Sequence, residues 1–267
     1  MGELLREWRR RRRRSQLDLA IEAGMSARHL SFVETGRSRP SRTLVLSLAN
    51  ELDIPLRERN ALMLAAGYAP TYTQFDLDDD QAYAAREALT RLLAGHEPYP
   101  ALVLDRWGDV VLANRSVGPL LTGVHPDLLG PPINVYRMSL HPEGLAPRIR
   151  NREEWTAHLG HRLIRLARLT GDPRLTRLLD EIREFPGVAA TLDDQHEPTS
   201  RELLLTLRLS HPAGELHLHS TVTSFGSPND VTLAELGVES FFPADDRTRD
   251  LLQQFATAAE AGSGPTS

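Results

Sequence analysis

The first 70 residues place apolar side chains at the spacing of amphipathic helices. Leu5 with Trp8, and Leu44 with Leu48 and Leu52, recur every three or four positions and would share one helix face. A serine able to cap a helix precedes three such segments, and a glycine follows three of them; these are Ser15, Ser26 and Ser41, and Gly24, Gly36 and Gly67. We therefore predict five short helices, forming an all-α domain over about residues 1–70.

Residues 16–35, QLDLAIEAGMSARHLSFVET, combine these features in a form that predicts a helix-turn-helix. Two helices, about 16–23 and 27–35, would meet at a tight turn at Gly24, with the small Ala20 where they cross. The second helix is apolar toward the core and polar elsewhere, as expected of a helix that enters the major groove of DNA. The alternative is a small helical bundle whose arginines are only solvated.

The residues expected to touch DNA form three groups. Gln16 opens the first of the two helices and would meet a phosphate. The start of the second helix would read bases through Ser26, Ala27, Arg28, His29 and Phe32. Arg28 suits a bidentate contact with guanine and Phe32 a thymine methyl group, although Phe32 could instead pack on its own domain. Flanking backbone contacts are expected from Arg37, Arg39 and Arg42. The run Arg9 to Arg14 exceeds one helical turn, so most of it is expected to be solvated.

Beyond residue 67 the pattern predicts a mixed domain. Residues 67–80 have the composition of a linker, with an acidic cluster of Asp76, Asp78, Asp79 and Asp80, and a helix follows over about 81–94 with Leu89, Leu92 and Leu93 on its apolar side. Aliphatic runs predict strands near 101–105, 109–113, 203–210, 215–225 and 236–242. Helices are expected from Asn151, with Glu154 completing a capping box, from Pro173, and over 247–261. Strands, then helices, then strands indicate an antiparallel sheet with helices on one face, and hence an α+β chain.

Composition narrows the function classes. The chain has 267 residues and no cysteine, which excludes disulfides and thiolate metal sites. All 31 basic residues are arginine, which excludes a Schiff-base lysine. Residues 1–70 hold 13 arginines against 8 acids, whereas the remainder holds 18 against 28, so a polyanion-binding module is joined to an acidic partner domain. No apolar run approaches about 18 residues; we expect a cytoplasmic protein that does not enter a membrane.

Several motifs resemble known regulators. Ser15-Gln16, the Ser26 cap, Ser31-x-x-Glu34-x-Gly36 and Pro40-Ser41 together resemble bacterial regulators of the xenobiotic-response-element type. The segment from Asp105 to Asn114 resembles the opening hairpin of a PAS sensor domain. Three further motifs resemble the MmyB-like transcription regulators: Pro131-Pro132-x-Asn134-x-x-Arg137-x-x-x-His141-Pro142-x-Gly144, Asn151-x-x-Glu154-Trp155, and Glu239-Ser240-Phe241-Phe242-Pro243-Ala244-Asp245. This resemblance runs over about residues 3–255.

The MmyB resemblance implies a DNA-binding domain at 1–70, a linker and connecting helix at 71–97, and a PAS-like ligand-binding domain at 98–261 that accepts a fatty-acid-like molecule. Candidate residues around an apolar pocket are Asn134, Trp155, Phe241 and Phe242. Arg137 or His141 would meet a carboxylate head group. The alternative is that these residues are core and that Arg137 and His141 pair with nearby acids.

Other features suggest no chemistry of their own. His217 and His219 share one strand face, as in a cupin-like metal sensor, but no glutamate follows them, so a solvated face is expected. A basic stripe on the helix from Asn151 is either solvated or a partner surface; it consists of His158, His161, Arg162, Arg165 and Arg168. The segment with Asp193, Asp194 and His196 has the composition of a loop.

We expect no enzyme activity and no cofactor. The leading hypothesis is a homodimeric regulator of duplex DNA that senses a small apolar ligand; the alternative is an adaptor whose C-terminal domain binds a protein.

Overall fold

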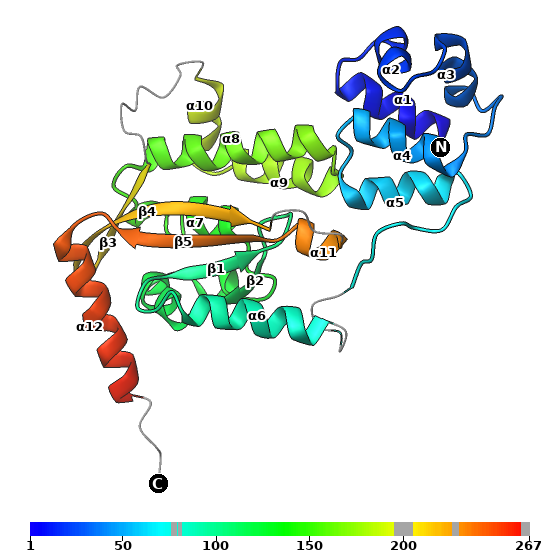
Figure 1. The fold of residues 1–267 in the computed structure, drawn as a ribbon. Helices are drawn as coiled ribbons and strands as arrows, with labels where there is room; N and C mark the ends of the chain where they lie inside the picture. The colour runs from blue at the N-terminus through cyan, green and yellow to red at the C-terminus, as the bar shows by residue number, and fades with distance from the viewer. Residues whose placement is uncertain (76–78, 80–81, 195–204, 226–229, 263–267) are drawn as a thin grey trace. The chain divides into compact units, whose positions relative to one another are not determined.

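The computed structural model describes residues 1–75, 79, 82–194, 205–225 and 230–262. It divides into two compact units, one built mainly of residues 1–76 and the other mainly of the residues that follow (Figure 1). Asp76, Asp78 and Asp80 of the acidic cluster, Gln81 and His196 lie outside the described residues. Within the described part, no helix combines the length and apolarity needed to span a bilayer.

The first unit contains all five predicted helices: α1 (Gly2–Arg11), α2 (Gln16–Glu22), α3 (Ala27–Glu34), α4 (Arg42–Glu51) and α5 (Leu56–Ala65). Leu5 and Trp8 are buried together, as their spacing predicts. On α4, Leu48 is fully buried and Leu44 only partly. One core therefore holds the five helices together.

Local hydrogen bonds set the boundaries of these helices. Ser15 forms a full capping box with Asp18, in which the Asp18 amide donates to Ser15 Oγ at 3.0 Å and the Ser15 amide donates to Asp18 Oδ2 at 3.3 Å. Ser26 and Ser41 cap α3 and α4 in the same position. Gly24 has φ +64°, a left-handed conformation that favours glycine and that lets α3 begin immediately after α2. The predicted helix-turn-helix is confirmed.

The second unit is built on a five-stranded antiparallel sheet. Its strands are β1 (Ala101–Leu104), β2 (Val110–Ala113), β3 (Thr206–His211), β4 (Gly214–Ser224) and β5 (Gly237–Pro243). They lie in the order β2-β1-β5-β4-β3. Strand β1 therefore pairs with β2 on one side and with β5 on the other. The antiparallel sheet, with helices inserted between its strands, confirms the α+β fold.

Helices cover the sheet in Figure 1. Between β2 and β3 come three 3-10 helices and four α-helices: η2 (Arg115–Leu121), η3 (Pro126–Leu128), α7 (Val135–Leu140), η4 (Ala146–Arg148), α8 (Arg152–Thr170), α9 (Pro173–Arg183) and α10 (Val188–Asp193). The remaining helices are α6 (Tyr83–Ala94), α11 (Val231–Ala234) and α12 (Asp246–Gly262). The segment around α10 carried no recognisable sequence motif.

Two expectations about these helices are wrong. Leu92 of α6 is exposed, whereas Leu89 and Leu93 are buried, so the buried stripe of α6 is narrower than the predicted three-leucine face. Asn151 precedes α8 but does not cap it. Its side chain instead binds the backbone of β3, accepting from the Arg208 amide at 3.0 Å and donating to the Thr206 carbonyl at 2.7 Å.

The β1–β2 turn is anchored to the start of α9. Trp107 Nε1 donates to Asp172 at 2.8 Å, and the guanidinium of Arg174 lies 4.4 Å from the Trp107 ring centroid. Arg106 forms ion pairs with Asp172 at 3.1 Å and with Glu235 at 2.7 Å. The polar residues of this turn therefore fix the helices against one end of the sheet.

Candidate DNA-reading surface and sensor core

The recognition helix α3 presents a defined outer face. Leu30 and Val33 are buried in the core of the first unit, at 0% and 1% exposure, while Arg28 and His29 are exposed and Ala27 and Phe32 are half-buried. Ser26 Oγ accepts from the His29 amide at 3.2 Å, so the Ser26 side chain is engaged as a cap. The amides of the first turn are left pointing outward, where they favour an anion such as a phosphate.

Arg28 and Phe32 form a contact on this face. The guanidinium carbon of Arg28 lies 5.4 Å from the centroid of the Phe32 ring, which is the geometry of a cation–π pair. Thr35 follows one turn later, and its hydroxyl donates back to the Ser31 carbonyl at 2.7 Å. The base-reading candidates of the sequence thus lie together.

Gln16 lies within the unit rather than on its outer surface. Its side-chain amide donates to Glu34 Oε2 at 2.7 Å, which leaves its second amide N–H and its backbone N–H at the start of α2 to meet a phosphate. Glu34 is 2% exposed and also accepts from Arg9, at 2.6 Å from Nε and 3.0 Å from Nη2. Residues of α1, α2 and α3 therefore converge on one buried carboxylate.

Opposing influences set the protonation of Glu34. Burial raises the pKa of this carboxyl, but the hydrogen bonds from Arg9 and Gln16 outweigh it and hold the pKa below its ordinary value of 4.5. Glu34 is therefore ionised at neutral pH and keeps both donors oriented. Sequence reasoning placed Glu34 only in a family motif and did not identify this role.

The flanking arginines differ in whether their guanidinium groups donate hydrogen bonds within the protein. Arg39 donates to the carbonyls of Ala66 and Gly67 at 3.3 and 3.4 Å, at the end of α5. Arg42 donates to Thr71 Oγ1 at 3.1 Å. Arg37 is exposed, and its guanidinium has no hydrogen-bond or ion-pair partner within the described residues. Of the three predicted phosphate contacts, Arg37 is thus the one whose guanidinium is uncommitted.

The arginine run is partly structural, contrary to the expectation that most of it is solvated. Besides Arg9, Arg12 donates to the carbonyls of Leu52 and Asp53 at 2.8 and 2.9 Å, where α4 ends. Arg14 pairs with Glu22 at 3.0 Å. A positively charged side chain at a helix C-terminus interacts favourably with the last carbonyls, so these arginines help to assemble the unit.

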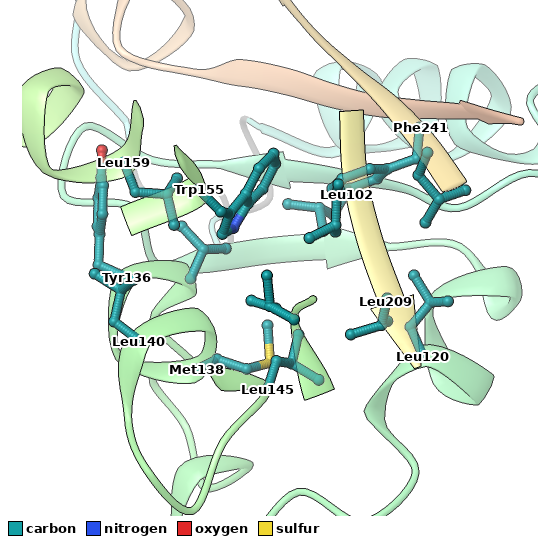
Figure 2. Packing of buried hydrophobic residues seen from close by; sticks show 14 of the residues in the cluster. Leu102, Leu120, Tyr136, Met138, Leu140, Leu145, Trp155, Leu159, Leu209 and Phe241 are labelled. Atoms are coloured by element: carbon teal, nitrogen blue, oxygen red, sulfur yellow. The ribbon is translucent and has the colours of Figure 1, made fainter. Parts of the chain in front are cut away.

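In the second unit, one face of the sheet and the helices between β2 and β3 enclose the main core (Figure 2). The strand register places alternate residues on this face: Leu102 and Leu104 of β1, Leu207 and Leu209 of β3, Leu216 and Leu218 of β4, and Phe241 of β5. Trp155, Leu159 and Leu163 of α8 pack against them and are at most 3% exposed. Trp155 and Phe241 therefore belong to the same buried core.

Phe242 does not belong to this face. It neighbours Phe241 in β5 and so points to the other side of the sheet, where it is 41% exposed and meets the His96 ring edge-on at 4.9 Å. Alternation along a strand is readable from sequence, and it should have separated these two phenylalanines.

The polar pocket candidates are engaged in local structure. Asn134 is buried and caps α7, accepting from the amides of Tyr136 and Arg137 and donating to Asp109 at 2.7 Å. Arg137 forms a bidentate pair with Glu181, at 2.5 and 2.7 Å. His141 lies against Phe185, with ring centroids 4.9 Å apart. These contacts match the alternative in which Arg137 pairs with a nearby acid.

Two polar features of the core were not foreseen. Trp155 Nε1 is buried and has no hydrogen-bond partner among the described residues, which is costly for a donor. Glu239 of β5 is 5% exposed on the core face, where Ser220 donates to it at 2.9 Å and Arg162 pairs with it at 3.3 Å. The sequence did contain a signal for the burial of Glu239. Glu239 and Phe241 are two residues apart in the same strand, so their side chains point to the same face of the sheet.

The remaining candidates have ordinary partners. His217 lies between Asp245 at 2.8 Å and Glu215 at 3.0 Å, and His219 contacts Thr206 Oγ1 at 3.2 Å. In the described parts of the chain, no cluster of three or more potential metal ligands is found.

The residues of the basic stripe on α8 differ in exposure. His161, Arg165 and Arg168 are exposed, as expected, whereas Arg162 turns inward to Glu239. Partial burial, with the nearby charge of Arg162, lowers the pKa of His158.

Comparison with known proteins identifies both units. The family model of the MmyB-like transcription regulator ligand binding domain matches residues 85–255, and a helix-turn-helix domain model matches residues 1–62. No curated protein matches the chain. Among solved structures, the PAS domain of Bordetella pertussis BvgS is 17% identical over 67% of this chain and 98% of its own, with a TM-score of 0.29. An RNA-binding light-oxygen-voltage receptor is 14% identical over 94% of this chain and 59% of its own, also at 0.29. The family matches show that the chain belongs to the MmyB-like transcription regulators, with a DNA-binding helix-turn-helix domain ahead of a ligand-binding domain.

Proposed function

We propose that this chain is a cytoplasmic, homodimeric regulator that reads duplex DNA with α3 and binds a fatty-acid-like molecule in the core of its second unit. The observation that carries the DNA part is the outer face of α3, which is capped by Ser26 and presents an exposed Arg28 whose guanidinium forms no hydrogen bond or ion pair with the described residues. Two copies would place such helices about 34 Å apart on one side of the duplex.

A gel-shift series tests whether the first unit binds DNA and the second does not. The full chain is expected to retard random genomic duplexes at low ionic strength, with an affinity that falls as salt rises because phosphate contacts release counterions. A chain that lacks residues 1–70 should bind no duplex, since the remainder is acidic. Retained binding by that remainder would contradict the proposal, as would the absence of any retardation by the full chain.

The ligand part is supported by an apolar core that contains one unpaired donor. Leucines from three strands face Trp155, whose Nε1 has no partner in the described chain. A molecule with a long apolar portion and an oxygen acceptor would match these apolar side chains and satisfy that donor. The bidentate Arg137–Glu181 pair makes Arg137 a weaker candidate for the head group, because binding a carboxylate there would first have to break this pair.

Native mass spectrometry and a binding titration test the ligand. The purified chain should carry an acyl molecule or take up an added sixteen-carbon fatty acid. Trp155→Phe should weaken uptake several-fold, while Phe242→Leu, on the outer face, should not. No uptake by the wild-type chain, together with a stoichiometric protein partner, would favour the adaptor alternative.

The ligand would control DNA affinity through the thermodynamic linkage between ligand binding and DNA binding. A ligand changes operator affinity only if it binds the two states of the protein with different affinity. We propose that the linker at 67–80 and the following helix α6 transmit this difference. Operator binding measured with and without the fatty acid tests this proposal, and equal affinities would contradict it.

A further inference from the structure

The outer face of α3 is centred on two side chains. Successive helical residues are rotated by about 100°, so Arg28 and Phe32 lie only about 40° apart around the axis. Leu30 and Val33, which are buried, lie on the opposite side. Arg28 and Phe32 are therefore the two large side chains on the face of α3 opposite the core.

These two side chains form one unit in the protein alone. The Arg28 guanidinium carbon lies 5.4 Å from the Phe32 ring centroid, and Phe32 is half-buried whereas Arg28 is exposed. A guanidinium held over a ring keeps its N–H donors in its own plane, where they can address the edge of a base. Within the described residues, no carboxylate or carbonyl competes for those donors.

Arg28 differs in this respect from several other arginines of the unit. Arg9, Arg12, Arg39 and Arg42 each donate to protein oxygens. Those four guanidinium groups are therefore engaged within the protein. Arg28 combines an uncommitted guanidinium with an aromatic platform that fixes its orientation.

We propose that Arg28 and Phe32 read one dinucleotide together, a guanine beside a thymine. Arg28 donates to guanine O6 and N7. Phe32 orients the guanidinium and packs its ring edge against the 5-methyl group of the neighbouring thymine. Fixing Arg28 before binding reduces the side-chain entropy that is lost on contact, so Phe32 is a positioning residue for guanine as well as a contact for thymine. This inference rests on the proposed DNA-binding function.

Single-atom changes in the DNA test the contacts with the wild-type full chain. Sites are selected from a randomised duplex library, and the guanine and thymine are then replaced by 7-deazaguanine and uracil. Loss of a bidentate guanine contact corresponds to a weakening of roughly 5- to 150-fold, so 7-deazaguanine, which keeps O6, should fall in the lower part of that range. Loss of one buried methyl group corresponds to about fourfold. Selected sites with no adjacent guanine and thymine, or unchanged affinity after both replacements, would overturn the inference.

Variants test the coupling between the two side chains. Phe32→Leu keeps an apolar side chain but removes the ring face, and it should abolish most of the sensitivity to 7-deazaguanine. Arg28→Ala combined with Phe32→Leu should cost less than the sum of the single changes, as for interacting residues. Arg10→Ala removes an exposed arginine from α1 and is the control, which should leave both base preferences intact. Full additivity of Arg28→Ala and Phe32→Leu would overturn the joint role.

The outcomes separate two kinds of failure. If the wild-type chain enriches no sequence and retards no duplex, the DNA-binding function itself is wrong. If it binds duplex and the modified bases have no effect, only the Arg28–Phe32 inference is wrong. The modified DNA decides this with the unaltered protein, so the result does not depend on how well Phe32→Leu folds.

Discussion

Replacing Glu34 by glutamine should destabilise the DNA-binding unit more than any exposed charge substitution there. The Glu34 side chain is fully buried and accepts three hydrogen bonds, two from Arg9 and one from Gln16. Glutamine is nearly isosteric but neutral, and it leaves the Arg9 guanidinium, only 11% exposed, without its counter-charge. Breaking a buried pair by removing one partner costs about 3–5 kcal/mol. Because the glutamine oxygen still accepts one bond, we expect about 3 kcal/mol.

The matched control is Glu7→Gln, which removes the same charge from an exposed pair. Glu7 and Arg11 are 55% and 28% exposed at their side chains, and such pairs contribute about 0–1 kcal/mol. Hydrogen exchange of the Leu30 and Val33 amides, followed by mass spectrometry in the full chain, reports the stability of α3 without assuming that both units unfold together. Glu34→Gln should accelerate this exchange by roughly a hundredfold. Equal exchange in Glu34→Gln and Glu7→Gln would refute the reasoning.

The same carboxylate gives the unit a pH dependence of predictable sign. The folded-state pKa of Glu34 lies below its ordinary value of 4.5, so the unfolded chain binds more protons over that interval. The resulting stabilisation is complete above about pH 4.5 and is lost as the pH falls through the folded-state pKa. Chemical denaturation of the first unit at pH 7 and at progressively lower pH should show this loss in the wild type, and Glu34→Gln should lack this component.

Four further substitutions test the second unit by thermal and urea denaturation. Leu163→Ala, at a side chain with 0% exposure in the centre of the core, should cost about 2–5 kcal/mol; a cost below 1 kcal/mol would mean that the core is not packed around α8. Phe241→Ala should cost about 3–5 kcal/mol and Phe242→Ala about 1 kcal/mol or less, and equal effects would contradict the strand register. Gly108→Ala should cost at least about 1 kcal/mol, because Gly108 has φ +80° and a Cβ there would lie 2.5 Å from the Tyr136 ring; a neutral result would show that the turn can rearrange.

Local sequence determined the helices of the first unit. The serine caps, the glycine that follows α2 and the apolar spacing all act within a few residues, so they can be read along the chain. The strands were predictable for the same reason, since a short aliphatic run is itself a local pattern. Asn151 shows where this reasoning fails. Its side chain does donate to Glu154, at 3.0 Å, but its oxygen accepts from the backbone of β3, more than 50 residues away, and does not cap α8.

Which polar side chains are buried together was decided only by the tertiary structure. Arg9, Gln16 and Glu34 come from three helices and meet at one carboxylate, and Glu239 meets Arg162 across the sheet face. Hydrogen bonds and ion pairs act over a few ångströms in space and leave no periodic signal in the chain. The sequence by itself therefore determined the elements, the charge asymmetry and the family. Packing decided which arginines remain uncommitted to the protein, and Arg28 is one of them.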